Sequence, residues 1–302
     1  SEYIDIDTNI QNKIAIQTYG FNDDLFNNKI DCDNLYSSKL KYKKKLVNKY
    51  NLKNINDNSI FNMQLSDFHE GKRQVLNVFY ILYLYLKLKD NVNTIITPTT
   101  FFIGGMSSFD YLFCKKTISL CLGLSKMINS DKLIQEKIKL VFVENIMLDK
   151  MPDFAKACDV FNYIPYKNFD ISNTYPYAFM NNGSIILTSN SNVYENMSRL
   201  KDIGVFKFDE ENFANTESSC MDFILKNIEL LENKKFIDEF YEIYNLILKY
   251  NDRFNVINSF DNFAEVNEKI QKWYLNENLW NGLIIKNIDI SKKFGINYLK
   301  DV

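Results

Sequence analysis

The residues that could do chemistry are few, and they concentrate in one short stretch. His69 is the single histidine among 302 residues, and it opens the run His-Glu-Gly-Lys-Arg at residues 69–73. An imidazole can act as a general acid or base near neutral pH, but one without a nucleophile partner is more typical of a hydrogen-bonded structural residue. A single histidine also argues against a histidine-rich metal site. The sequence therefore predicts no metal centre.

The cysteines indicate free thiols rather than a disulfide framework or a metal knuckle. They are odd in number and form no Cys-x-x-Cys pair: Cys32, Cys114, Cys121, Cys158 and Cys220. Three of them lie in apolar stretches, which is typical of buried thiols in a reducing compartment.

Charge and hydropathy exclude several classes of function. Hydrophobic residues make up 46% of the chain and charged residues 25%, which is the balance of a soluble globular protein. A net charge of −2 gives no general attraction to nucleic acid or to an acidic membrane. The basic run from Lys39 to Lys45 has the spacing of a solvated helix face. No signal peptide is visible, and the apolar segment 75–88 is too short to span a bilayer, so we expect a cytoplasmic protein.

Heavy use of Asn, Lys and Ile with 9 Gly suggests an AT-rich genome.

Strand-like and helical segments alternate from about residue 70. We expect helices over residues 74–89, 111–128, 220–231, 235–249, 260–275 and 277–288. We expect strands over residues 97–103, 139–144, 160–164, 184–188 and 205–208. Such alternation predicts an α/β fold, a Rossmann-like parallel sheet with helices on both faces and a helical C-terminal tail. The expected organisation is one structural domain: an N-terminal helical segment (1–57) packed on an α/β core (58–215), followed by C-terminal helices (216–302).

Several ordered motifs resemble one enzyme family. Residues 61–77 read Phe-Asn-Met-Gln-Leu-Ser-Asp-Phe-His-Glu-Gly-Lys-Arg-Gln-Val-Leu-Asn. This resembles the segment that opens the C-terminal domain of the glycogen and starch (α-glucan) phosphorylases. Further similar stretches follow in order at 103–105, 141–145, 157–159, 179–183, 251–254 and 280–294. The resemblance implies the cofactor-carrying lobe of a two-lobed GT-B glycosyltransferase fold, without the N-terminal lobe.

That family carries pyridoxal 5′-phosphate as a Schiff base on lysine and uses its phosphate to cleave or extend α-1,4-glucans. The resemblance places Ala178 at the lysine position, where no imine can form. In the glycine-rich phosphate loop of the family, Asn173 and Tyr175 replace glycines. We therefore expect pyridoxal phosphate to be lost and this loop to occupy the pocket.

The charges that hold phosphate in the family are also replaced. The resemblance aligns Asp67 with an arginine, and Ser66 with the lysine beside it. Met147 aligns with a second arginine and Met106 with a second lysine. A carboxylate in place of a guanidinium repels phosphate at close range.

Other family positions are retained, and we interpret them as structural: His69, Glu70, Lys72, Arg73, Gly104, Gly105, Glu144, Asn145 and Asp170. No catalytic, cofactor-binding or metal-binding residue is predicted.

These losses predict a catalytically dead phosphorylase-like domain that acts as a protein-binding, scaffold or regulatory subunit. The aromatic residues between Tyr163 and Tyr177 would fill the vacated pocket, contact a protein partner, or do both. A larger assembly or a homo-oligomer would fit, and glucan binding is not expected. Two alternatives remain open: a subunit of a split or divergent α-glucan phosphorylase, and a residual sugar- or nucleotide-binding module at the carboxyl edge of the sheet.

Overall fold

The computed structural model describes residues 32–108, 110–144, 146, 150–167, 169, 174–197, 203–210 and 218–298. Its strands are β1 (Ile60–Leu65), β2 (Thr99–Gly104), β3 (Ile138–Val143), β4 (Val160–Tyr163), β5 (Ile185–Thr188) and β6 (Val205–Lys207). Its α-helices are α2 (Cys32–Lys49), α3 (Gln74–Asp90), α4 (Leu112–Ser130), α5 (Met151–Ala157), α6 (Thr174–Asn181), α7 (Asn192–Met197), α8 (Ser219–Asn227), α9 (Lys234–Lys249), α10 (Phe260–Tyr274) and α11 (Glu277–Tyr298). Short 3-10 turns cover Glu70–Lys72 and Ile228–Leu231.

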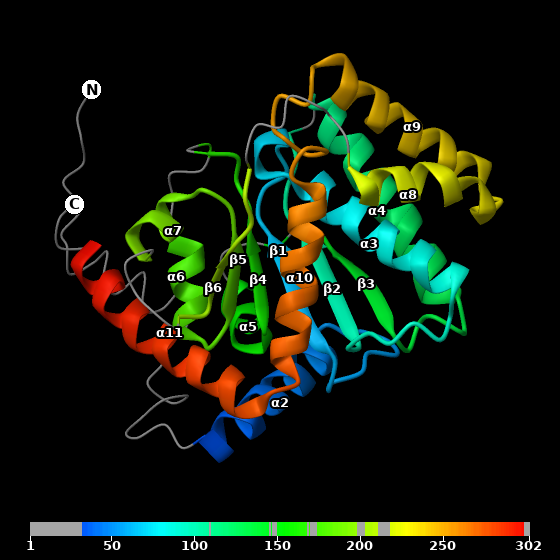
Figure 1. The fold of residues 1–302 in the computed structure, drawn as a ribbon. Helices are drawn as coiled ribbons and strands as arrows, with labels where there is room; N and C mark the ends of the chain where they lie inside the picture. Colours follow the sequence, from blue (N-terminus) through cyan, green and yellow to red (C-terminus); the bar gives the residue numbers. More distant parts are fainter. Residues whose placement is uncertain are drawn as a thin grey trace, which may run out of the picture.

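The six described strands form one parallel sheet in the order β3-β2-β1-β4-β5-β6 (Figure 1). This order places β1 and β4 side by side at the centre, where the chain reverses its direction of travel across the sheet. In doubly wound sheets this switch point opens a crevice at the carboxyl ends of the two strands, and ligands bind there. The predicted fold class, a Rossmann-like α/β domain, is confirmed.

The sequence analysis did not predict the central strand β1. Its sequence alternates apolar side chains with Asn62 and Gln64, which is typical of a half-exposed strand, yet all six residues are buried. The two amides are satisfied inside the protein. The Asn162 amide donates to Asn62 Oδ1, and Asn77 Nδ2 donates to Gln64 Oε1 at 3.1 Å. Hydropathy does not predict that these amide side chains are buried, because their burial depends on hydrogen-bond partners in other segments of the chain.

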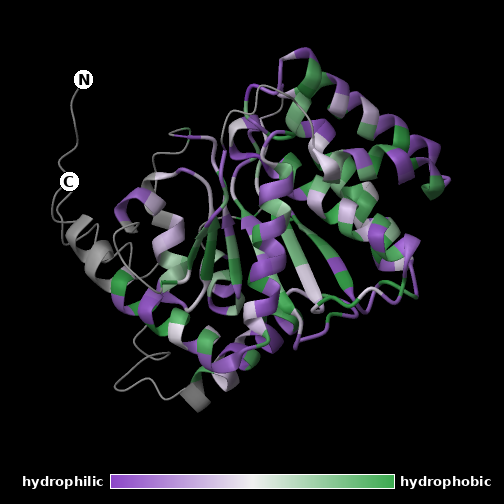
Figure 2. Cartoon of the chain, viewed as in Figure 1, coloured by the Kyte–Doolittle hydropathy of each residue, from purple (hydrophilic) through white to green (hydrophobic). Residues whose placement is uncertain are grey.

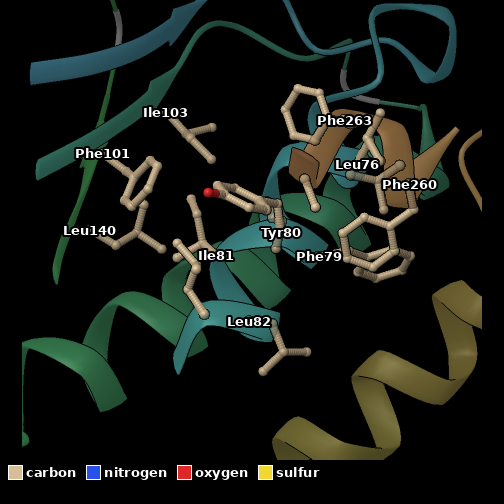
Figure 3. Packing of buried hydrophobic residues seen from close by; sticks show 14 of the residues in the cluster. Leu76, Phe79, Tyr80, Ile81, Leu82, Phe101, Ile103, Leu140, Phe260 and Phe263 are labelled. Atoms are coloured by element: carbon tan, nitrogen blue, oxygen red, sulfur yellow. The ribbon is translucent and has the colours of Figure 1, made fainter. Parts of the chain in front are cut away.

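Two apolar cores lie on opposite faces of the sheet. One packs α3, α4, α8, α9 and α10 against one side, and the other packs α5 and α6 against the reverse side. Figure 2 shows the consequence: the strands are mostly hydrophobic, whereas the surrounding helices mix hydrophobic and hydrophilic residues. In the first core, Tyr80 of α3 stacks edge-on with Phe101 and Phe263, at centroid distances of 6.2 and 5.6 Å (Figure 3). This packing fixes α3, and therefore the loop before it, relative to β2 and α10.

The predicted helices and strands are found, with ends that shift by a few residues. Two differences matter. α11 continues to Tyr298, and the 171–177 segment, predicted as a loop, begins α6 at Thr174. α2 packs on α5 and α11, while residues 1–31 lie outside the described residues. The domain boundaries near residues 57 and 215 stay a prediction.

The interpretation of the basic run as a solvated face was wrong for two of its lysines. Lys39 and Lys43 are 5% and 3% exposed, on the side of α2 that faces the sheet, whereas Lys41, Lys44 and Lys45 are exposed. Residues four positions apart lie on the same face of a helix, so Lys39 and Lys43 share the buried face of α2. The other three lysines of the run lie on its exposed side. Four of the five cysteines are buried free thiols, as expected; the side chain of Cys32 lies outside the described set.

Candidate functional site

The described residues leave little space in the crevice at the switch point. The hollow there, lined by side chains at the ends of β1 and β4, by Lys72 and by Tyr175, has room for about 10 Å³. A volume of that size holds about one water molecule.

Arg73 closes the crevice from within. Its Nε donates to the carbonyl of Ile164 at 2.8 Å, and its Nη2 donates to the carbonyl of Pro165 at 3.2 Å. Nη2 also lies 2.5 Å from Glu210 Oε1, and both side chains are buried. Burial lowers the pKa of Arg73, and the Glu210 carboxylate opposes that shift. The guanidinium therefore joins the segment after β1 to the segments after β4 and β6, and its charge is neutralised inside the protein.

Glu70 and Arg253 connect two of the family-like segments. The Arg253 guanidinium donates to Glu70 Oε2 and lies over the ring of Phe254, 4.9 Å from its centroid. Next to it, Asp252 accepts hydrogen bonds from the backbone N–H groups of residues 256, 257 and 258 at 2.7–3.0 Å. Glu70 is thus paired with a cation of its own chain.

His69 has a local structural contact. Its Nδ1 accepts a hydrogen bond from the Gly71 N–H at 3.1 Å, which caps the short 3-10 turn. The ring stacks on Phe169, with centroids 4.2 Å apart, and lies 5.2 Å from the Tyr111 ring. Burial lowers the pKa of His69, so the neutral imidazole that accepts this bond is favoured. His69 thus has a structural hydrogen bond and two ring contacts, and the interpretation of its role stays a prediction.

Gly104 and Gly105 are required by close packing of the backbone. Gly105 has φ +152°, and a Cβ there would lie 1.9 Å from the Ser66 carbonyl oxygen. The turn brings the Met106 carbonyl within 2.7 Å of the Phe68 N–H. The side chains of Met106 and Asp67, which the resemblance aligns with phosphate-binding positions, are both exposed.

Ala178 lies within α6 and is 1% exposed. Its carbonyl accepts a hydrogen bond from the Asn182 side chain at 2.8 Å. Tyr175, predicted in a loop, lies in the first turn of this helix and lines the small hollow. The described part of this segment is therefore a helix rather than a loop, and the expectation that it fills a vacated cofactor pocket stays a prediction.

Of the remaining predicted positions, the structure describes only Glu144. Glu144 is exposed just after β3. Asn145, Met147, Asp170 and Asn173 lie outside the described residues.

Glu210 was missed by the sequence analysis. It follows β6 in an unremarkable polar run, and only the fold brings its carboxylate to Arg73. Within the described part of the chain, no group of three or more His, Cys, Asp or Glu side chains could hold a metal ion. The same part contains no helix with both the length and the apolar character needed to cross a bilayer.

Six parallel strands in this order, covered by helices on both faces, define a Rossmann-like domain. Within the described residues, the Arg73–Glu210 pair lies at its switch point. The sequence model of the family described as carbohydrate phosphorylase matches residues 21–298, so the chain belongs to that family.

Curated relatives include the liver glycogen phosphorylase of sheep (Ovis aries), 27% identical over 273 residues that make up 85% of this chain and 32% of the relative. The glycogen phosphorylase of Bacillus subtilis is 30% identical over 271 residues, 82% of this chain and 34% of the relative. The human muscle form is 27% identical over 275 residues, again 85% and 32%. The chain spans about one third of the length of these relatives.

Proposed function

We propose that this chain is a catalytically inactive member of the phosphorylase family that works as a protein-binding or scaffold subunit, without pyridoxal phosphate and without glucan turnover. The observation that carries the proposal is the closed switch point. The hollow left there holds about 10 Å³, and the Arg73 cation beside it is neutralised by Glu210.

The described residues do not fit pyridoxal phosphate. A Schiff base needs a lysine amine, and Ala178 at the matching position is buried in α6. A phosphate needs free cations or bare backbone N–H groups, whereas the cations Arg73 and Arg253 are already paired with carboxylates. Asp67 adds negative charge at the same edge. No catalytic step is therefore assigned to the cofactor in this chain.

A row of aromatic side chains at this edge supports a protein partner. Tyr111, His69, Phe169 and Phe254 follow one another at centroid distances of 5.2, 4.2 and 5.9 Å. Arg253 lies over the rings of Phe254 and Tyr250, at 4.9 and 5.3 Å. We call these six residues the aromatic row. Tyrosine and arginine dominate the energetics of protein interfaces, and a rigid row exposes apolar area at little cost in side-chain entropy.

Three members of the row are accessible enough to bind, among them Arg253, whose side chain is 50% exposed. Phe169 is 42% exposed and Tyr250 is 51% exposed. Nearby on the same edge, Met106 is 49% and Leu112 is 60% exposed. The partner expected here is a protein surface that presents aliphatic side chains to the rings.

Purification of the native protein from its own cells, with paired variants, tests this function. Phe169→Glu should remove the co-purifying protein, whereas Ile95→Glu should retain it. Ile95 is 96% exposed and precedes β2, at the opposite edge of the sheet, so it controls for added charge. A partner that survives Phe169→Glu but is lost with Ile95→Glu would contradict binding through the aromatic row.

A sugar- or nucleotide-binding module at the carboxyl edge of the sheet is the second candidate, and the small hollow at that edge weighs against it. Sugars and nucleotides need cavities of about 300 Å³ or more. Thermal unfolding with glucose 1-phosphate, maltoheptaose, ATP and NAD separates the two functions. We expect no shift in melting temperature with any of them, and a saturable rise would favour the second candidate.

A further inference from the structure

Helix α2 carries two buried lysines at the amino edge of the sheet, remote from the aromatic row. Lys43 is fully paired. Its Nζ lies 2.5 Å from Asp159 Oδ2, donates to the Ser59 carbonyl at 2.9 Å, and lies 4.9 Å from the centroid of the Phe61 ring. Asp159 also accepts the Phe61 N–H at 2.8 Å. This lysine has the contacts of a structural ion pair.

Lys39, one helical turn earlier, has a different environment. Its Nζ donates to the carbonyl of Cys158, and within the described residues no carboxylate lies within ion-pair distance of it. The side chain is 5% exposed. Burial lowers the pKa of Lys39, Asp159 and the Cys158 thiol oppose the shift, and Lys43 adds to it, so that the resulting pKa is about 8. A large share of this amine is therefore unprotonated, and nucleophilic, just above neutral pH.

The amine lines a cavity of about 30 Å³ formed by α2, residues 57–58, Asp159 and the α10–α11 corner. The other titratable groups on its wall are Tyr36, Lys43, Asp57, Asp159 and Tyr274. Asp57 Oδ1 is buried there with no hydrogen-bond partner. At the rim, the hydroxyl of Tyr36 donates to Asn58 Oδ1 at 3.2 Å, and both residues are exposed. The cavity thus combines a desolvated amine, an unsatisfied acceptor and a route to solvent.

We propose that Lys39 is a modification site, at which small acyl groups of two or three carbons are transferred to the amine from an acyl thioester or acyl phosphate. The nitrogen lone pair attacks the carbonyl carbon, the C–N bond forms, and the C–S or C–O bond to the leaving group breaks. The thiolate or phosphate departs with the bonding electrons, and the amine proton goes to solvent. The amide N–H that remains can still donate to the Cys158 carbonyl.

The cavity sets the size of the acyl group. An acetyl group adds three heavy atoms, which matches a space a little larger than one water molecule. A ring-sized acyl group does not fit without moving Tyr274 or Trp280, which line the same wall.

Trace labelling of the native wild-type chain tests the proposal, with acetic anhydride as the probe and peptide mass spectrometry as the readout. Three lysines of α2 are compared in one experiment: Lys39, the exposed Lys41 and the ion-paired Lys43. At pH 7.5 we expect Lys39 to be acetylated roughly tenfold faster than Lys41, because more of its amine is neutral. Its rate should reach half its maximum near pH 8, and Lys43 should react more slowly than both.

A second arm uses benzoic anhydride, for which the preference for Lys39 over Lys41 should disappear. The proposal would be overturned if Lys39 were acetylated no faster than Lys41 in the native chain, while the two lysines reacted equally in urea. Lys39 would then be a buried structural residue that only donates to the Cys158 carbonyl. If Lys39 were preferred over Lys41 equally with both anhydrides, the cavity would not set the size of the acyl group.

Discussion

Arg73 Nη2 lies 2.5 Å from Glu210 Oε1, and the two side chains are 0% and 2% exposed. This pair lies where a Rossmann-like sheet would otherwise open its ligand crevice. The guanidinium also donates to the carbonyls of Ile164 and Pro165 after β4, so one side chain connects the segments that follow three strands. The centre of the site is thus a structural clamp.

Single substitutions in this clamp should be costly. Removing one partner leaves the other charge buried without a counter-ion, so Arg73→Met or Glu210→Leu alone should lower the free energy of unfolding by about 3–5 kcal/mol. The double variant should lose less than the sum of the two, since no bare charge remains. Urea unfolding of all four proteins measures this coupling, and strictly additive losses would show that the pair is not a unit.

Two glycines should respond to alanine in opposite directions. Gly105→Ala places a Cβ 1.9 Å from the Ser66 carbonyl oxygen at φ +152°, so we expect a loss of at least about 2 kcal/mol in stability. Gly282, inside α11, has nothing within 4 Å of an added Cβ, and alanine there should stabilise by about 0.5–1 kcal/mol. Thermal melts compare the two variants. Equal effects at both sites would contradict the tight turn after β2.

Buried thiols should make the fold sensitive to alkali. Burial raises the pKa of Cys121 from 9.0 to about 12. The neutral thiol's contribution to stability is complete below pH 9 and is lost as pH rises from 9 towards 12, because only the unfolded chain ionises in that window. In reducing buffer, the stability of the wild type should therefore fall more steeply between pH 9 and 10.5 than that of Cys121→Ala. Parallel slopes in urea titrations would place this thiol in contact with water.

Regular patterns made most of the fold predictable. Two strands could be predicted from apolar runs, at residues 139–144 and 184–188, because strands of a parallel sheet are covered on both faces. The helix at residues 74–89 could be predicted from the helical spacing of its apolar residues. β1 left no such signature, since Asn62 and Gln64 are satisfied by amides from distant segments.

The sequence names residues at the family positions, but it does not give their arrangement. The positions of Ala178 and Asp67 could be read along the chain, and so could the required Gly104 and Gly105. The partner of Arg73 could not, because Glu210 is 137 residues away and carries no motif of its own. Likewise, the spacing of the lysines in α2 shows which share a face, but not that this face is the buried one.

The central claim is that this chain has no phosphorolytic chemistry, and one assay tests it most directly. The purified protein is incubated with saturating pyridoxal phosphate, orthophosphate and maltoheptaose, and glucose 1-phosphate is measured beside a glycogen phosphorylase control. We predict no release above the rate without protein, because Ala178 supplies no amine and the Arg73–Glu210 pair occupies the crevice. Cofactor-dependent release of glucose 1-phosphate would contradict the account.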